Sequence, residues 1–99
     1  MAKLPPPPFE LYTGQTGGFI GFDDGNELIS LPLHTLASLS LRGSGSPQQL
    51  TLEFANHLVQ IKGANLSTIV NHIEVGRVRR IRSGQAEDSK VESVTVLEM

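Results

Sequence analysis

Residues 50–82 read LTLEFANHLVQIKGANLSTIVNHIEVGRVRRIR, and three structural signals follow one another in this stretch. Apolar residues first alternate with polar ones, as they do in two consecutive half-buried β-strands. These apolar residues are Leu50, Leu52, Phe54, Val59 and Ile61. The next apolar residues recur at the i, i+3, i+4 and i+7 positions of a helix, namely Leu66, Ile69, Val70 and Ile73. Four arginines within six residues close the stretch.

This order of signals predicts an α+β domain. A mainly antiparallel sheet of about five to seven strands, joined as a meander of hairpins, should pack on one helix near residues 65–75. Gly63 should end the strand before the helix, Asn65 should cap the helix with its side-chain oxygen, and Gly76 should end it. Eight residues should form the centre of the core: Leu52, Phe54, Val59, Ile61, Leu66, Ile69, Val70 and Ile73.

Strand and turn signals also cover the N-terminal half of the chain. Residues 9–12 favour an edge strand, and residues 18–31 favour a hairpin around an Asp-Gly turn. Pro32 should take the chain out of the sheet and into a short helical turn. Residues 38–42 alternate between serine and leucine, as a half-buried strand does. The glycine- and serine-rich residues 43–47 are typical of the tip of a long hairpin.

Two parts of the chain differ in composition. Residues 1–9 form a proline-rich arm, which we expect to be extended, and residues 10–99 form a single small α+β domain. Its C-terminal part contains an acidic tail and, at residues 91–97, enough valine and threonine for a last strand. This strand pairs either within the chain or with a second copy.

Composition excludes several classes of protein. The chain has no cysteine, which rules out disulfides, thiolate nucleophiles and cysteine-ligated zinc. Its first residues do not have the pattern of a signal peptide, and no apolar run approaches the roughly 20 residues that a membrane-spanning helix needs. We therefore expect a soluble cytoplasmic protein that does not contact a membrane.

Catalytic and metal-binding patterns are missing from the sequence. The three histidines have no partners at metal-ligand spacing. The glycines of residues 14–18 lack the Lys-Ser/Thr ending of a phosphate loop, and Asp23 and Asp24 fit a turn better than a calcium loop. We expect a protein that is not an enzyme and that binds no cofactor, no metal and no small-molecule substrate.

The arginine strip, which we define as Arg77, Arg79, Arg80 and Arg82, is the candidate binding site. Val78 and Ile81 within it are three apart, so a strand there needs a bulge to bury both. Guanidinium groups fork onto phosphate oxygens, so the strip could follow a nucleic-acid backbone. However, the chain carries a net charge of −2, and no aromatic residue interleaves with the arginines to stack bases.

A second interpretation pairs the arginine strip with the acidic tail, within one chain or between two copies. The acidic residues are Glu87, Asp88, Glu92 and Glu98. This interpretation favours a non-enzymatic interaction or assembly module that self-associates, or binds another protein, through sheet edges and charge exchange. A nucleic-acid-binding domain that uses the strip is the alternative.

One segment carries a family resemblance. Residues 61–66, Ile-Lys-Gly-Ala-Asn-Leu, with Gly76 and Val78 after them, resemble the Ile-x-Gly-x-Asn-Leu and Gly-x-Val pattern of the small YabP-like sporulation proteins. The matching residues are mostly turn and core residues, and we carry no function over from them.

Overall fold

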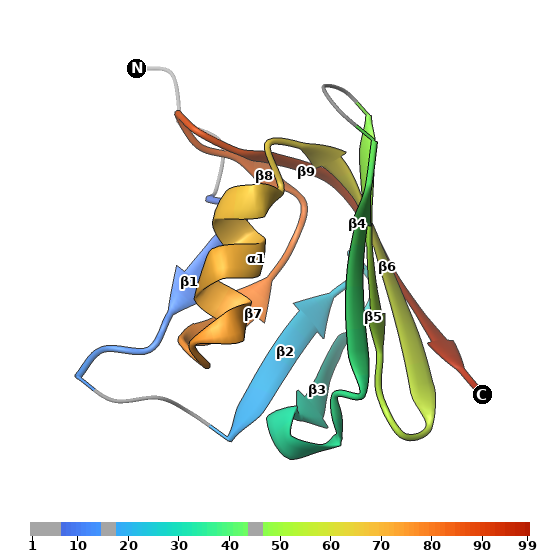
Figure 1. Ribbon diagram of the computed structural model, residues 1–99. Helices are drawn as coiled ribbons and strands as arrows, with labels where there is room; N and C mark the ends of the chain where they lie inside the picture. Colours follow the sequence, from blue (N-terminus) through green and yellow to red (C-terminus); the bar gives the residue numbers. More distant parts are fainter. Residues whose placement is uncertain (1–6, 15–17, 44–46) are drawn as a thin grey trace.

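The computed structural model describes residues 7–14, 18–43 and 47–99. Within these residues nine strands form two sheets, and one α-helix connects them (Figure 1). The predicted α+β class, mainly antiparallel with one helix, is confirmed. The described residues form nine strands, not the predicted five to seven, and the strands make two sheets instead of one.

The first sheet has four strands, and the second has five. In spatial order the first contains β1 (Phe9–Leu11), β7 (Val78–Ile81), β2 (Phe19–Asp23) and β3 (Leu28–Pro32). The second contains β4 (Ser38–Arg42), β5 (Gln48–Glu53), β6 (His57–Ala64), β9 (Lys90–Glu98) and β8 (Gly84–Gln85). All neighbours are antiparallel except β2 and β7, which are parallel.

Two short elements direct the chain between the sheets. The 3₁₀ turn η1 (Leu33–Thr35) follows β3 and turns the chain away from the first sheet, which is why the strands do not form one meander. Pro32 is the last residue of β3 rather than the first outside it. Because β3 is an edge strand, the missing N–H of proline costs no ladder bond there. Helix α1 (Ser67–Glu74) then connects β6 to β7.

The core lies between the two sheets and α1. Seven of the eight residues predicted for its centre are buried, and the eighth, Val70, is partly buried. Phe22 of β2 and Phe54, which follows β5, join the two sheets through an edge-to-face contact with ring centroids 5.8 Å apart. Such aromatic pairs add stability beyond their buried area.

Helix α1 ends as predicted but begins differently. Gly76 has a φ of 72°. Its N–H donates to the Ile73 carbonyl at 2.9 Å, while the Arg77 N–H donates to the His72 carbonyl at 3.0 Å. This is a Schellman ending. At the other end Asn65 does not cap the helix.

The acceptor at the start of α1 comes from a distant strand. Asn65 has a φ of 55°, and Leu66, the residue that precedes the helix, receives no local side-chain cap. Instead its N–H donates to Oε1 of Gln48 on β5, at 2.8 Å. Gln48 reaches this position because it pairs with Gly63 in the neighbouring strand. The prediction that Asn65 caps the helix is therefore wrong.

Gly63 also has a different role from the one predicted. Strand β6 continues through it to Ala64, and Gly63 is buried at an irregularity in the β6–β9 pairing. A Cβ atom there would overlap the Lys90 carbonyl oxygen and lie 3.0 Å from the Val91 Cα. Gly63 thus permits a close approach of β9 and does not end the strand.

The last strand pairs within the chain, where the sequence left two alternatives. Strand β9 lies between β6 and β8 in the second sheet. The predicted polyproline arm, glycine-rich bend and hairpin tip lie partly outside the described residues. Across the described ranges, no helix has the length and apolar character needed to span a bilayer.

Candidate functional site

The arginine strip lies on β7 and the residues that flank it. Val78 and Ile81 are both buried, although they are three apart. The strand bulges to allow this: Val78 pairs with Leu11 and Arg80 pairs with Glu10, which leaves Arg79 without an opposite residue on β1. The bulge predicted for a strand that buries both Val78 and Ile81 is therefore present. It also separates the arginines into two environments.

Arg80 and Arg82 share one carboxylate. Arg80 Nη1 lies 3.6 Å from Glu10 Oε2, and Arg82 Nη2 lies 3.4 Å from Glu10 Oε1. The Nε of Arg82 also donates to the Pro7 carbonyl at 3.1 Å. The backbone N–H of Arg82 donates to the Pro8 carbonyl at 2.9 Å. These two arginines therefore hold the chain before β1 against β7.

Arg77 and Arg79 differ from this pair. Both side chains are exposed, and neither makes an ion pair within the described residues. The structure thus does not bring the four arginines into one uniform surface. Arg80 and Arg82 contact Glu10, whereas Arg77 and Arg79 face solvent.

Among the described residues, the acidic tail makes no ion pair with the arginine strip. Glu87 and Asp88 are exposed in the turn between β8 and β9, and Glu92 pairs with Lys90 at 3.8 Å. Glu92 and Glu98 lie on β9, which pairs with β6 in the second sheet, whereas the arginines lie on and beside β7 of the first. The acid that neutralises part of the strip is Glu10. The sequence predicted only that Glu10 lies in an edge strand, and did not predict that Glu10 pairs with the arginines.

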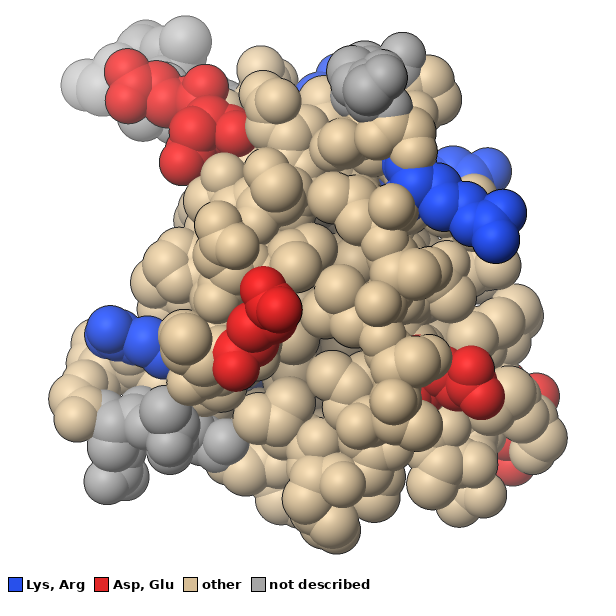
Figure 2. Space-filling model, in the orientation of Figure 1, with Lys and Arg blue, Asp and Glu red and all other residues tan. Residues whose placement is uncertain are grey.

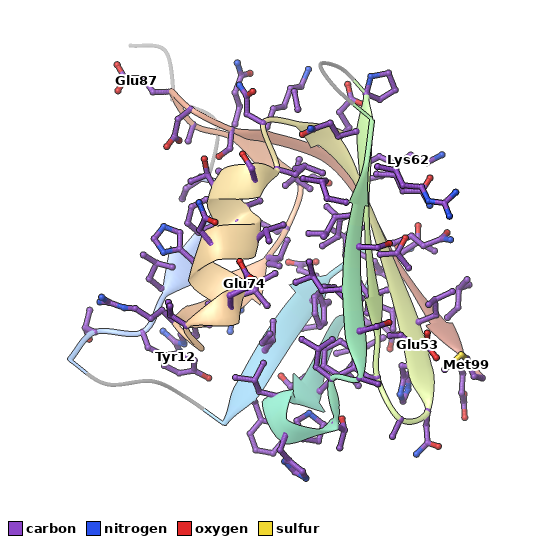
Figure 3. The ribbon with its side chains drawn as sticks, viewed as in Figure 1. Tyr12, Glu53, Lys62, Glu74, Glu87 and Met99 are labelled. Atoms are coloured by element: carbon purple, nitrogen blue, oxygen red, sulfur yellow. The ribbon has the colours of Figure 1, made fainter. Side chains whose placement is uncertain are left out.

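A shallow groove with both polar and apolar surface opens on another side of the molecule. It has a volume of about 520 Å³ and lies where η1, the start of β4 and the C-terminal end of α1 meet. Its lining consists of Leu33, Leu36, Ala37, Ser38, Leu39, Ile73, Glu74, Val75 and Gly76. Figure 3 labels Glu74, the one carboxylate of this lining, on α1. The lining supplies aliphatic contact but no pair of groups for acid–base chemistry.

The same side of the molecule carries little charge. Figure 2 shows a surface that is mostly uncharged, with one acidic side chain near its middle and the other charged groups toward its rim. The groove could not be predicted from local patterns, because its lining comes from two segments, residues 33–39 and 73–76, that are far apart in the chain. Leu33 and Leu36 follow Pro32, where the sequence predicts only a short helical turn.

Strand β4 forms an open edge beside this groove. It is the first strand of the five-stranded sheet, and in the described part of the chain it is hydrogen-bonded to β5 only. Ser38, Ser40 and Arg42 are exposed on one face of the strand, while Leu39 and Leu41 are partly buried on the other. Leu39 also lines the groove.

The outer face of this sheet has its charges at opposite ends of the strands. Register places Arg42, Gln49 and Lys62 in one row across β4, β5 and β6. It places Ser38 and Glu53 in the row at the other end. Figure 3 shows Lys62 and Glu53 at different heights along the same side of the sheet. One end is therefore basic and the other acidic.

The aspartates of the hairpin turn have the role that the sequence predicts. Asp24 Oδ1 accepts the N–H of Glu27 at 2.9 Å and of Asn26 at 2.8 Å. These hydrogen bonds favour the charged carboxylate and lower the pKa of Asp24 below its usual value of 3.8. Across the residues that the structure describes, no group of three or more His, Cys, Asp or Glu side chains could hold a metal ion.

Comparison of the chain with protein families, with curated proteins and with solved structures finds no match.

Proposed function

We propose that this protein is a non-enzymatic assembly module that associates through an open edge of its five-stranded sheet. The observation that carries this proposal is β4, a regular five-residue strand at the end of the sheet, beside a groove with several aliphatic side chains in its lining. An edge strand offers unpaired backbone N–H and C=O groups to another strand. The half-buried Leu39 and Leu41 give such a partner apolar surface to cover.

The other edges are less suited to pairing. Strand β3 ends in Pro32, which cannot donate a ladder hydrogen bond. Strand β1 has three residues and β8 has two, and short edge strands resist pairing with other chains. The β4 edge combines five residues that can all donate backbone hydrogen bonds with regular alternation and neighbouring aliphatic side chains.

The proposal is tested by the mass of the protein in solution. Light scattering during size-exclusion chromatography should give a mass above the 10.7 kDa of one chain as the protein concentration rises. The association should weaken in salt, because charged groups lie at both ends of the edge. A mass of one chain at every concentration would overturn the assembly proposal.

Nucleic-acid binding through the arginine strip is a second candidate. It is favoured by one observation: Glu10 is a single carboxylate shared by two guanidinium groups, while Arg77 and Arg79 are exposed. The strip therefore keeps a net positive charge that could contact phosphates.

This candidate predicts salt-dependent binding of a fluorescent mixed-sequence oligonucleotide. Replacing Arg77 and Arg79 together by alanine should abolish the binding without disturbing the ion pairs of Glu10. Lys62→Ala, which removes one exposed positive charge from the other sheet, is the control. Absence of binding by the wild-type chain at low salt would exclude this function.

A further inference from the structure

We propose that β4 pairs with β4 of a second copy, antiparallel and across a two-fold axis that passes through Ser40. The inference rests on the proposed assembly function and names its partner and its register. Pairing that uses all five residues of the strand, Ser38–Arg42, must be centred on its middle residue. The two five-stranded sheets then become one continuous sheet.

The inner faces of the two strands are complementary in this register. Leu39 of one copy lies opposite the partner's Leu41, and Leu41 lies opposite the partner's Leu39. Directly opposed residues share a face of the sheet, so both leucine pairs lie on the side of the groove. Both leucines are only partly buried in the single chain, so the pairing removes further apolar surface from water.

The outer faces are complementary in charge. The same register places the partner's Arg42 opposite Ser38, whose neighbour on β5 is Glu53. The Ser38 hydroxyl donates to Glu53 Oε2 at 3.4 Å, so this carboxylate already leans toward the free edge. Two strand spacings, about 10 Å, separate the Cα atoms of Glu53 and the partner's Arg42. The two long side chains can meet over the small serine between them.

The charge pattern also explains why a two-fold arrangement fits and a parallel one does not. Arg42 and Glu53 lie at opposite ends of the strands, and within the described residues neither makes an ion pair. Antiparallel pairing brings the basic end of one copy beside the acidic end of the other, twice. Parallel pairing would place the two Arg42 side chains together. The isologous interface is the one that a closed dimer requires.

The interface is small, so the dimer should be weak and reversible. Two five-residue strands and their neighbouring side chains bury less than the roughly 1,200 Å² that is typical of stable complexes. A transition from monomer to dimer should therefore appear within an accessible range of concentrations. This makes the contribution of single charges measurable.

Charge reversal tests the register. Sedimentation equilibrium would be measured on the full chain and on Arg42→Glu, Glu53→Arg and the double variant. Each single reversal places two like charges together twice in the dimer, and should weaken it by on the order of tenfold. The double variant restores opposite charges and should dimerise as the wild type does. Lys62→Glu is the matched control, because Lys62 is exposed on the same face but two strands from the edge.

The outcomes separate this inference from the function on which it rests. A weaker dimer in both single variants, with recovery in the double variant and no change in Lys62→Glu, supports β4 pairing. A wild-type oligomer that none of the four variants affects overturns β4 pairing and leaves assembly standing. A wild-type chain that is monomeric throughout overturns both. Circular dichroism melting curves equal to that of the wild type establish that the variants are folded.

Discussion

Replacing Gly63 by alanine should destabilise the fold strongly, because β9 passes directly over this residue. The new Cβ would overlap the Lys90 carbonyl oxygen, and it would lie 2.9 Å from the Lys90 carbonyl carbon and 3.0 Å from the Val91 Cα. All three atoms are backbone, so no side chain can rotate to make room. The clash is relieved only if β9 moves away from β6, along the most extensive pairing of the sheet.

The expected cost is about 3 kcal/mol in the free energy of unfolding. Overpacking of a well-packed site typically costs about 1–3 kcal/mol, and a clash with backbone belongs at the upper end of that range. A domain of this size has a total stability of about 5–15 kcal/mol. The melting temperature should therefore fall by about 12–24 °C.

Thermal and urea unfolding, followed by circular dichroism, measure this difference. Gly18→Ala is the control, because a Cβ at Gly18 meets no atom within 4 Å. Its effect should stay within about 0.5 kcal/mol. A Gly63→Ala variant as stable as the Gly18→Ala variant would refute the close approach of β9, and with it the pairing of β6 and β9 in the second sheet.

Three further substitutions test other parts of the structure. Ile69→Asp places a carboxylate at a fully buried position of α1 and should abolish cooperative unfolding; an unchanged melting curve would show that the helix is misplaced. Asp24→Asn should flatten the pH dependence of stability in acid, because the lowered pKa of Asp24 stabilises the folded protein above the pKa of the unfolded chain. This contribution is lost as the pH falls through the pKa of the folded state, so the melting temperatures of wild type and variant should converge or cross between about pH 5 and 2. Parallel curves would contradict the turn hydrogen bonds. Glu10→Gln should lower the free energy of unfolding by about 1 kcal/mol or less, because Arg80 and Arg82 are partly exposed. Urea unfolding should show that this difference between wild type and variant becomes smaller in about 1 M salt. A difference that salt leaves unchanged would argue against the ion pairs.

Local patterns were sufficient to predict the longer elements of this fold, but not the two-residue strand β8. The alternation at residues 38–42 and 50–61 and the helical spacing from Leu66 to Ile73 show which side chains of each element face the core. This information lies in the order of neighbouring residues, so it can be obtained from the sequence. The glycine ending of α1 is equally local. Seven residues of the predicted core centre are buried for the same reason.

Features that depend on distant contacts could not be predicted in this way. Gly63 was interpreted as a strand end because its closest neighbours, Lys90 and Val91, belong to a strand much later in the chain. Asn65 was interpreted as a cap because nothing local shows that the side chain of Gln48 occupies the acceptor position. The division into two sheets follows from the direction in which η1 turns the chain. Strand patterns in the sequence do not predict this direction.

The candidate sites show the same limit. The four arginines of the strip lie within six consecutive residues and were found from the sequence, but their partner Glu10 is brought there by the pairing of β1 with β7. The open β4 edge and the groove beside it depend on which strand the fold leaves at the end of a sheet. No periodicity in the chain distinguishes that strand from its neighbours.

Hydrogen exchange of the β4 amides at two protein concentrations tests assembly through this edge most directly. The lower concentration would be one at which sedimentation gives the mass of a monomer, and the higher one at which it gives the mass of a dimer. Pairing of β4 predicts slower exchange in residues 38–42 at the higher concentration, with the amides of β1 and β3 unchanged. Slower exchange in β1 or β3 and none in residues 38–42, or a chain that is monomeric at both concentrations, would contradict it.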